Sequence, residues 1–246
     1  MMRSRWAGAA LAVALGMMTA GSAGAQQTDV ALVYRLLDQA QMVVTRGNTP
    51  QPPAKIGDRL RNGDQVFTSG NTRAALRFTD DGSILRLNPN SQVALTSRNE
   101  NGVVVRTLSL EFGELWARVN RRDGTHLRVS TPAGVAAVKG TEFLVRYRDG
   151  VATVITLEGV VEFFNGAGRV DVTAGQKVTA DSATAPRSQP ATRDELRETA
   201  GAGGEDRGAV QGTWVEVQLR DASGQTRSLM LQLPADAVRQ RLEGRP

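Results

Sequence analysis

The sequence contains one histidine, His126, and no cysteine, and these two counts limit the chemistry available to the chain. Without cysteine there is no disulfide, thiolate zinc site, iron–sulfur cluster or cysteine nucleophile. A single histidine rules out a multi-histidine metal site. A Ser-His-Asp triad needs only one histidine, but no Gly-x-Ser-x-Gly elbow is present and Ser130 lies on the same predicted strand. We interpret His126 as an ordinary strand residue and expect no catalytic residue.

Two acidic pairs, Asp80-Asp81 and Glu111/Glu114, have the residue types of a glycosidase or calcium site. The first pair lies in an Asp-Asp-Gly turn, and the Asp-x-Asp-x-Asp-Gly calcium loop with its distant glutamate is missing. We therefore interpret both pairs as carboxylates of turns or of a sheet rim. The sequence predicts no metal site.

Residues 134–141 contain the residue types of a phosphate-binding P-loop. A P-loop ends in Gly-Lys-Ser/Thr and leads into a helix whose N-terminus holds the phosphate. Here the order is Lys-Gly-Thr, and residues 142–147 have the pattern of a strand. The glycines at 201–204 lack the strand and helix that flank a dinucleotide-binding fingerprint. The sequence therefore predicts no cofactor.

Short strands are the elements that must position any site. Between about residues 31 and 180, apolar and polar residues alternate with period two, which is typical of strands with one buried face. Turn-forming Gly, Asn and Asp residues separate these runs, mostly at intervals of 9 to 11 residues. The spacing predicts an all-β fold, either a compact β-roll or solenoid-like stack or a sandwich, and it excludes βαβ architectures.

The C-terminal part of the chain has a different composition. Residues 182–212 are rich in Ala, Ser, Thr, Pro and Gly, which indicates a flexible linker with a short helix around the charged residues 193–198. Residues 213–219 and 227–233 alternate around a turn and predict a β-hairpin, and residues 235–243 predict a short helix. Because a lone hairpin is marginal in water, we expect this tail to dock on the main domain or on a partner.

The N-terminus has the pattern of a secretory signal peptide. Arg3 and Arg5 precede an apolar run, which is followed by small residues and an Ala23-x-Ala25 cleavage pattern. We expect residues 1–25 to be removed and the mature chain to begin at Gln26. The alternative, an uncleaved membrane anchor, requires a run of about 20 apolar residues, and this run is shorter. The predicted location is periplasmic or secreted.

The charge balance argues against nucleic acid as a partner. The whole chain has 30 basic and 25 acidic residues, and removing the two arginines of the signal peptide leaves 28 minus 25, or +3. The arginines are scattered along predicted strands rather than clustered on one face. Arg118, Arg128, Arg146 and Arg148 are expected to line sheet faces. There they would either contact an acidic partner or form a solvated polar face.

Residues 131–143, from Thr131-Pro132 to Lys139-Gly140-Thr141-Glu142-Phe143, resemble the most characteristic segment of the FecR domain family. Further segments follow the order of that family and extend the resemblance over about residues 42–181. We expect the motif residues to be structural, and they are Gly63, Asp64, Asp81, Gly82, Thr131, Pro132, Lys139, Gly140, Thr141, Phe143, Glu158, Gly159 and Gly175. Lys139 stands where arginine is usual in the family.

The resemblance implies an exported β module that binds protein partners. The best-known members bind the signalling domain of an outer-membrane receptor and control a sigma factor through a cytoplasmic helical segment and a transmembrane helix. Only five residues precede the apolar run here, so neither of these two segments is expected. The expected domains are a FecR-like β domain at 26–181, with its core at about 42–181, then the linker and the hairpin tail at 213–246.

These observations predict a non-enzymatic exported protein that binds envelope proteins in signalling or regulation. The alternative is a structural or adhesive surface protein that binds glycan or another envelope component.

Overall fold

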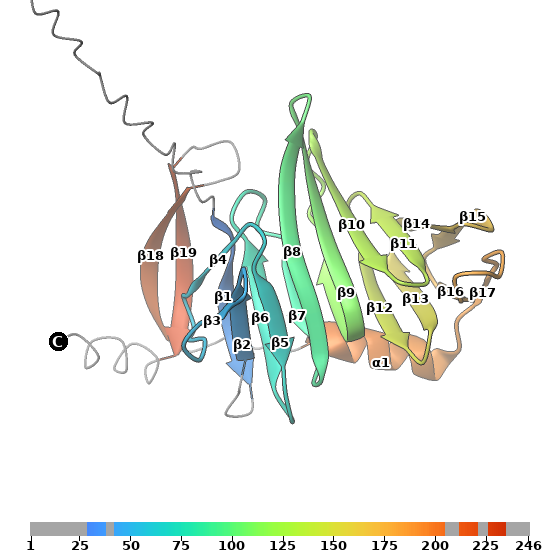
Figure 1. Ribbon diagram of the computed structural model, residues 1–246, viewed down its shortest axis with the longest axis horizontal. Helices are drawn as coiled ribbons and strands as arrows, with labels where there is room; N and C mark the ends of the chain where they lie inside the picture. Colours follow the sequence, from blue (N-terminus) through green and yellow to red (C-terminus); the bar gives the residue numbers. More distant parts are fainter. Residues whose placement is uncertain (1–28, 38–41, 205–211, 221–225, 235–246) are drawn as a thin grey trace, which may run out of the picture.

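The computed structural model describes residues 29–37, 42–204, 212–220 and 226–234 (Figure 1). The predicted signal peptide at 1–25 and the predicted helix at 235–243 lie outside these residues. In the described part of the chain, no helix is long and apolar enough to cross a membrane.

Two β-sheets make up most of the described chain. Sheet A contains, in spatial order, β4 (Arg59–Arg61), β1 (Asp29–Leu37), β6 (Arg73–Phe78), β7 (Ile84–Leu87), the C-terminal part of β9 (Val103–Arg118), β12 (Glu142–Arg148), β13 (Val151–Glu158), β16 (Gln176–Ala180) and β17 (Ser188–Pro190). Sheet B contains β3 (Thr49–Pro50), β2 (Met42–Arg46), β5 (Gln65–Thr68), β8 (Ser91–Glu100), the N-terminal part of β9, β10 (Thr125–Thr131), β11 (Gly134–Val138), β14 (Val160–Asn165) and β15 (Gly168–Thr173).

The chain moves between the two sheets as it progresses. The hairpin of β10 and β11 in sheet B is followed by the hairpin of β12 and β13 in sheet A, then by β14 and β15 in sheet B. The arrangement therefore has the two facing sheets of a sandwich and the stepwise growth of a roll. The predicted all-β fold is confirmed.

One apolar core lies between the sheets. The alternation of the strands directs one side chain in two toward it, as period two requires. Fully buried members from sheet A include Leu76, Leu85, Leu115, Phe143 and Val154, and those from sheet B include Val66, Val93, Leu108, Val129 and Phe163. This core fixes the strands that carry every polar residue discussed below.

The 16-residue strand β9 belongs to both sheets. Its N-terminal part pairs with β8 and β10 of sheet B, and its C-terminal part pairs with β7 and β12 of sheet A. The change occurs at Gly113, whose φ of 99° lies in the region that favours glycine. A Cβ on Gly113 would lie 2.5 Å from the Cα of Ser91 and 2.6 Å from the carbonyl oxygen of Asn90.

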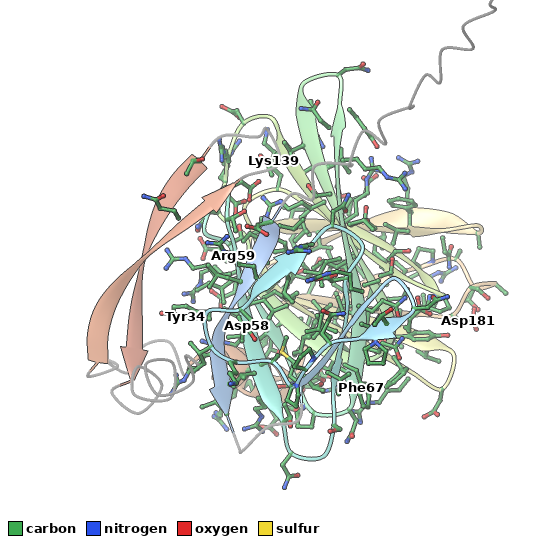
Figure 2. All side chains as sticks on the ribbon, turned by 60° about the vertical axis from the view of Figure 1, so that its left-hand side comes forward. Tyr34, Asp58, Arg59, Phe67, Lys139 and Asp181 are labelled. Atoms are coloured by element: carbon green, nitrogen blue, oxygen red, sulfur yellow. The ribbon has the colours of Figure 1, made fainter. Side chains whose placement is uncertain are left out.

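Two further elements follow the sheets. The predicted hairpin is formed by β18 (Gly212–Arg220) and β19 (Thr226–Pro234), which pair antiparallel. Arg59 of β4 donates a hydrogen bond from Nη2 to the carbonyl oxygen of Gln218 at 2.6 Å. Figure 2 shows Arg59 on the side of the sheets that faces the hairpin. The hairpin thus contacts the main body of the protein through β4.

The short helix expected around residues 193–198 is present, but residues 188–204 pack on sheet A and do not form a flexible linker. This segment forms β17, which extends sheet A, and the helix α1 (Arg193–Gly204), which crosses sheet A below β9, β12 and β13 in Figure 1. The polar composition suggested a mobile segment, but contacts with sheet A hold it in place. These contacts join residues far apart in the sequence, and local composition does not reveal them.

The sheet change at Gly113 gives a first prediction. Gly113→Ala should lower the free energy of unfolding by about 2–5 kcal/mol, combining about 1–2 kcal/mol for positive φ with about 1–3 kcal/mol for overpacking. Gly102→Ala is the matched control, because Gly102 has a φ of 85° and nothing within 4 Å of an added Cβ. It should lose only the positive-φ part, about 1–2 kcal/mol. Urea unfolding measures both, and equal losses would contradict the role assigned to the close contact.

Candidate functional site

The outer face of sheet A carries a row of side chains that crosses five neighbouring strands. Register places Arg86, Trp116, Leu144, Ile155 and Lys177 opposite one another on β7, β9, β12, β13 and β16. We call these residues the Trp116 row. Five strands span about 19 Å, and the 12 residues of α1 span about 18 Å. The helix lies along the row and matches its length.

Trp116 is the largest fully buried side chain of the described residues, although it faces away from the inter-sheet core. The guanidinium carbon of Arg86 lies 4.9 Å from the indole ring centroid, and that of Arg118 lies 5.3 Å from it. Both distances are in the range of cation–π attraction. The indole Nε1–H is buried and has no hydrogen-bond acceptor among the described residues. Buried Trp N–H groups usually have one.

Three polar contacts hold α1 on the row. Lys177 donates to Oε1 of Glu195 at 2.5 Å, Arg146 lies 3.4 Å from Oε1 of Glu198, and Arg86 Nη1 donates to the carbonyl oxygen of Ala202 at 2.5 Å. The hydrogen bond from Lys177 is the main cause that lowers the pKa of Glu195 to about 2. Glu195 is therefore ionised at every physiological pH.

The N-terminus of α1 is well capped. The backbone N–H of Glu195 donates to Thr192 Oγ1 at 3.2 Å, and the backbone N–H of Thr192 donates to Glu195 Oε2 at 2.8 Å. This reciprocal pair is a capping box. The other end is weaker, because each of Gly201, Gly203 and Gly204 costs about 1 kcal/mol of helix propensity relative to alanine.

A buried carboxylate lies next to the row. Glu114 of β9 accepts hydrogen bonds from Arg146 Nε and Asn88 Nδ2, and its side chain is 7 % exposed. On the other side of Trp116 along β9, Arg118 donates to Oε2 of Glu142 from Nε at 3.0 Å and from Nη2 at 2.8 Å. The outer face of sheet A therefore alternates cations and carboxylates around one tryptophan.

A cavity of about 240 Å³ lies between sheet A and the C-terminal half of α1. Arg35, Arg73 and Arg86 contribute cations to its wall, and Glu114 and Glu198 contribute carboxylates. The helix therefore leaves part of this face unfilled.

The motif residues from the sequence lie in turns and ion pairs away from α1. Asp64 follows Gly63 in a turn, is fully buried, and accepts a bidentate pair from Arg46 at 2.9 and 2.7 Å. Its Oδ2 also accepts the backbone N–H of Arg61 at 2.8 Å. The hydrogen bond to Asp64 raises the pKa of the Arg46 guanidinium. This cluster ties β2 to the β4–β5 turn.

Asp81 and Gly82 lie in the β6–β7 turn. Asp81 is 2 % exposed at its side chain and accepts two hydrogen bonds from Arg106, which is 1 % exposed and lies over the Phe78 ring at 4.4 Å. Burial raises the pKa of the neighbouring Asp80 above its usual value. The turn was expected from the sequence. Asp81 is a turn carboxylate as expected, although its side chain is buried against Arg106. The expectation of a rim carboxylate is corrected for Glu114, which is buried against Arg146, whereas Glu111 is exposed.

Five of the remaining motif residues lie at or next to one junction. Gly159 has a φ of 80°, and a Cβ there would lie 2.9 Å from both the carbonyl oxygen of Gly140 and Cγ2 of Thr141. Phe143, two residues further on, is fully buried in the core. Glu158 is exposed and pairs with Glu142 across β12 and β13.

The last four motif residues are separate. Thr131 Oγ1 accepts the backbone N–H of Gly134 at 3.2 Å in the β10–β11 turn, next to the exposed Pro132. Lys139 is 43 % exposed and lies 3.5 Å from Asp123. Gly175 forms the β15–β16 turn with a φ of 81°. The structure does not gather the motif residues into one site.

The described residues offer binding surfaces more than reactive groups. They contain no group of three His, Cys, Asp or Glu residues that could hold a metal ion. His126 is exposed on the outer face of sheet B. Of the four arginines that were expected to line sheet faces, Arg118 and Arg146 are ion-paired on sheet A, while Arg128 and Arg148 are exposed.

Sequence reasoning missed the Trp116 row. One signal was present, because Phe143-Leu144-Val145 is a continuous apolar run, which indicates a strand that is buried on both faces. The pairing of that strand with β9, and the cover by α1, depend on contacts between distant residues. No local pattern gives them.

The buried turn gives a second prediction. Asp81→Asn should cost about 3–5 kcal/mol of stability, because it leaves Arg106 buried without a full countercharge. Asp80→Asn is the matched control and should raise stability at pH 7. Because folding raises the pKa of Asp80, its ionised carboxylate destabilises the folded protein. The gain from Asp80→Asn should therefore shrink as the pH falls through the pKa of Asp80. Thermal unfolding from pH 3 to 7 measures the stability of both variants. Equal losses of stability in the two variants at pH 7 would refute the different roles assigned to Asp81 and Asp80.

The contact between α1 and Trp116 gives a third prediction. Gly203→Ala should loosen α1, since a Cβ at that position would lie 2.5 Å from Cζ2 of Trp116. Gly201→Ala is matched in propensity, has nothing within 4 Å of its Cβ, and should strengthen the helix by about 1 kcal/mol. Hydrogen exchange of the α1 amides should show opposite changes in the two variants. Changes in the same direction would show that propensity, not contact, governs the helix.

Part of the chain matches a known protein family. A family model described as "FecR protein" matches residues 64–162. The match runs from the β4–β5 turn into β14, so it includes every residue of the Trp116 row except Lys177, and it does not include α1.

Similar solved structures include two crystal structures of a candidate anti-sigma factor from Parabacteroides distasonis ATCC 8503, at 2.50 Å and 1.65 Å resolution. Each is 17% identical in sequence with a TM-score of 0.46, and the similarity covers 54% of this chain and 62% of that protein. The chain thus spans less than two thirds of the length of that protein. No curated protein sequence matches this chain. The match over residues 64–162 covers less than half of the chain, and this part of the chain is similar to a FecR domain.

Proposed function

We propose that this protein is an exported, non-enzymatic module that binds a protein partner in cell-envelope signalling or regulation. The FecR domain supports a regulatory role. The signal-peptide pattern of residues 1–25 supports export to the periplasm or beyond.

The observation that carries the proposal is the polar and aromatic outer face of sheet A. Under α1 it holds a tryptophan between two arginines, with paired carboxylates beside it, on strands fixed by a rigid core. Trp and Arg are the residue types most enriched among energetically dominant contacts in protein interfaces. A binding surface on rigid strands needs no catalytic group to act.

The proposal is tested in the native host with a C-terminally tagged chain. The tagged protein should begin at Gln26, fractionate with the cell envelope, and, after crosslinking in intact cells, be captured together with the same envelope protein in each repeat. A chain lacking residues 2–25 is the control and should stay in the cytosol without that partner. An uncleaved cytosolic product, or no partner above the control level, would overturn the proposal.

Access of added protease to the tagged chain in intact cells separates the two locations. Protection indicates the periplasm. Digestion indicates the cell surface and would favour the adhesive alternative.

A further inference from the structure

We propose that the Trp116 row is a docking surface for an acidic helix of a partner protein, and that α1 occupies this surface when the partner is absent. The inference rests on the proposed function and names the surface through which it would act.

The bound helix shows what the surface recognises. Lys177, Arg146 and Arg86 meet Glu195, Glu198 and the carbonyl oxygen of Ala202. Positions 195, 198 and 202 lie at i, i+3 and i+7, which is one face of a helix. The cations on the strands are therefore spaced to meet acceptors along a helix, with acidic residues at its N-terminal end.

The fit of α1 to the row is incomplete in two places. The side chain of Trp116 is only 1 % exposed, and its buried Nε1–H has no hydrogen-bond acceptor among the described residues. Beside it lies the cavity of about 240 Å³ that α1 does not fill. A helix that supplies an acceptor to the indole and larger side chains toward the cavity would fit this face better than α1 does.

The helix α1 is also easy to displace. Its C-terminal turn contains three glycines, which favour the unfolded segment. The side chain of Glu198 is 67 % exposed, so its pair with Arg146 is largely screened by solvent. A partner helix with fewer glycines competes with a weak occupant rather than with an empty, solvated surface.

The partner helix has a defined chemistry. It carries two acidic residues three positions apart, near its N-terminus, to meet Lys177 and Arg146. About two turns later it carries a glycine over Trp116, because a Cβ at the position of Gly203 comes within 2.5 Å of the indole.

The test uses a fluorescent peptide of residues 191–204 with Gly201→Ala and Gly204→Ala, which keeps Gly203. The full chain with Glu195→Lys and Glu198→Lys should release α1, because both lysines would face Lys177 and Arg146. The peptide should bind this variant at least tenfold more tightly than it binds the wild-type chain. If the variant does not fold, Gly203→Ala loosens α1 by steric contact and takes its place.

Two controls define specificity. A peptide with both glutamates changed to lysine should bind at least tenfold more weakly, and Lys177→Glu added to the variant chain should weaken binding of the original peptide. No binding of the peptide, or equal binding of both peptides, overturns the inference.

Capture of the envelope partner separates this inference from the proposed function. If α1 covers the docking surface, the loosened variant should capture several times more partner than the wild-type chain. Equal capture by both chains overturns the inference and leaves the proposed function in place. If neither chain captures a partner, the proposed function fails, and the peptide assay decides alone whether the row binds acidic helices.

Discussion

The passage of β9 from sheet B to sheet A is the constraint on which the other features depend. Before Gly113, the even-numbered residues Arg106, Leu108 and Leu110 face the core. After it, the odd-numbered residues Leu115 and Ala117 do so. A shift of one residue moves every following side chain to the other face of a strand. The register of β8 against β9 shifts by one residue between Leu110 and Phe112, just before this glycine. This shift places the even-numbered residues that follow, Trp116 among them, on the outer face of sheet A.

The same strand brings buried charges to two different places. Arg106 lies between the sheets and pairs with Asp81 from the β6–β7 turn, while Glu114 lies on the outer face and pairs with Arg146. Buried pairs contribute little net stability, because desolvation offsets their attraction, but a broken pair is costly. Their effect here is to make wrong registers unfavourable. A slip of β9 by one residue would turn Glu114 into the apolar core and would carry Arg106 to the outer face, away from Asp81.

Much of the fold was predictable from the sequence, and the candidate site was not. Period two and the turn glycines gave the strands and the all-β class, because both are local consequences of backbone geometry. Arg106 shows the limit: its charge is typical of a solvent-facing residue, and only the pairing of its strand reveals that it is buried against Asp81. Trp116 and α1 are separated by more than 70 residues, and their contact depends on five strands lying in register. The motif residues were recognised because turn residues and buried apolar residues form local sequence patterns, whereas the residues of an outer sheet face do not.

The composition of α1 conflicts with its position, and the conflict has a physical explanation. A helix that covers the largest buried side chain of the fold would be expected to contain strong helix formers. This one has a sound capping box and ends in glycines, one of which is required by the close approach to Trp116. Gly201 has no such requirement, since its Cβ would meet nothing within 4 Å. Local weakness without a local packing reason is typical of segments that must move or be replaced. The FecR family match contains most of the Trp116 row but not the helix above it, so most of the surface lies in the matched part of the chain and its cover lies in the segment that follows.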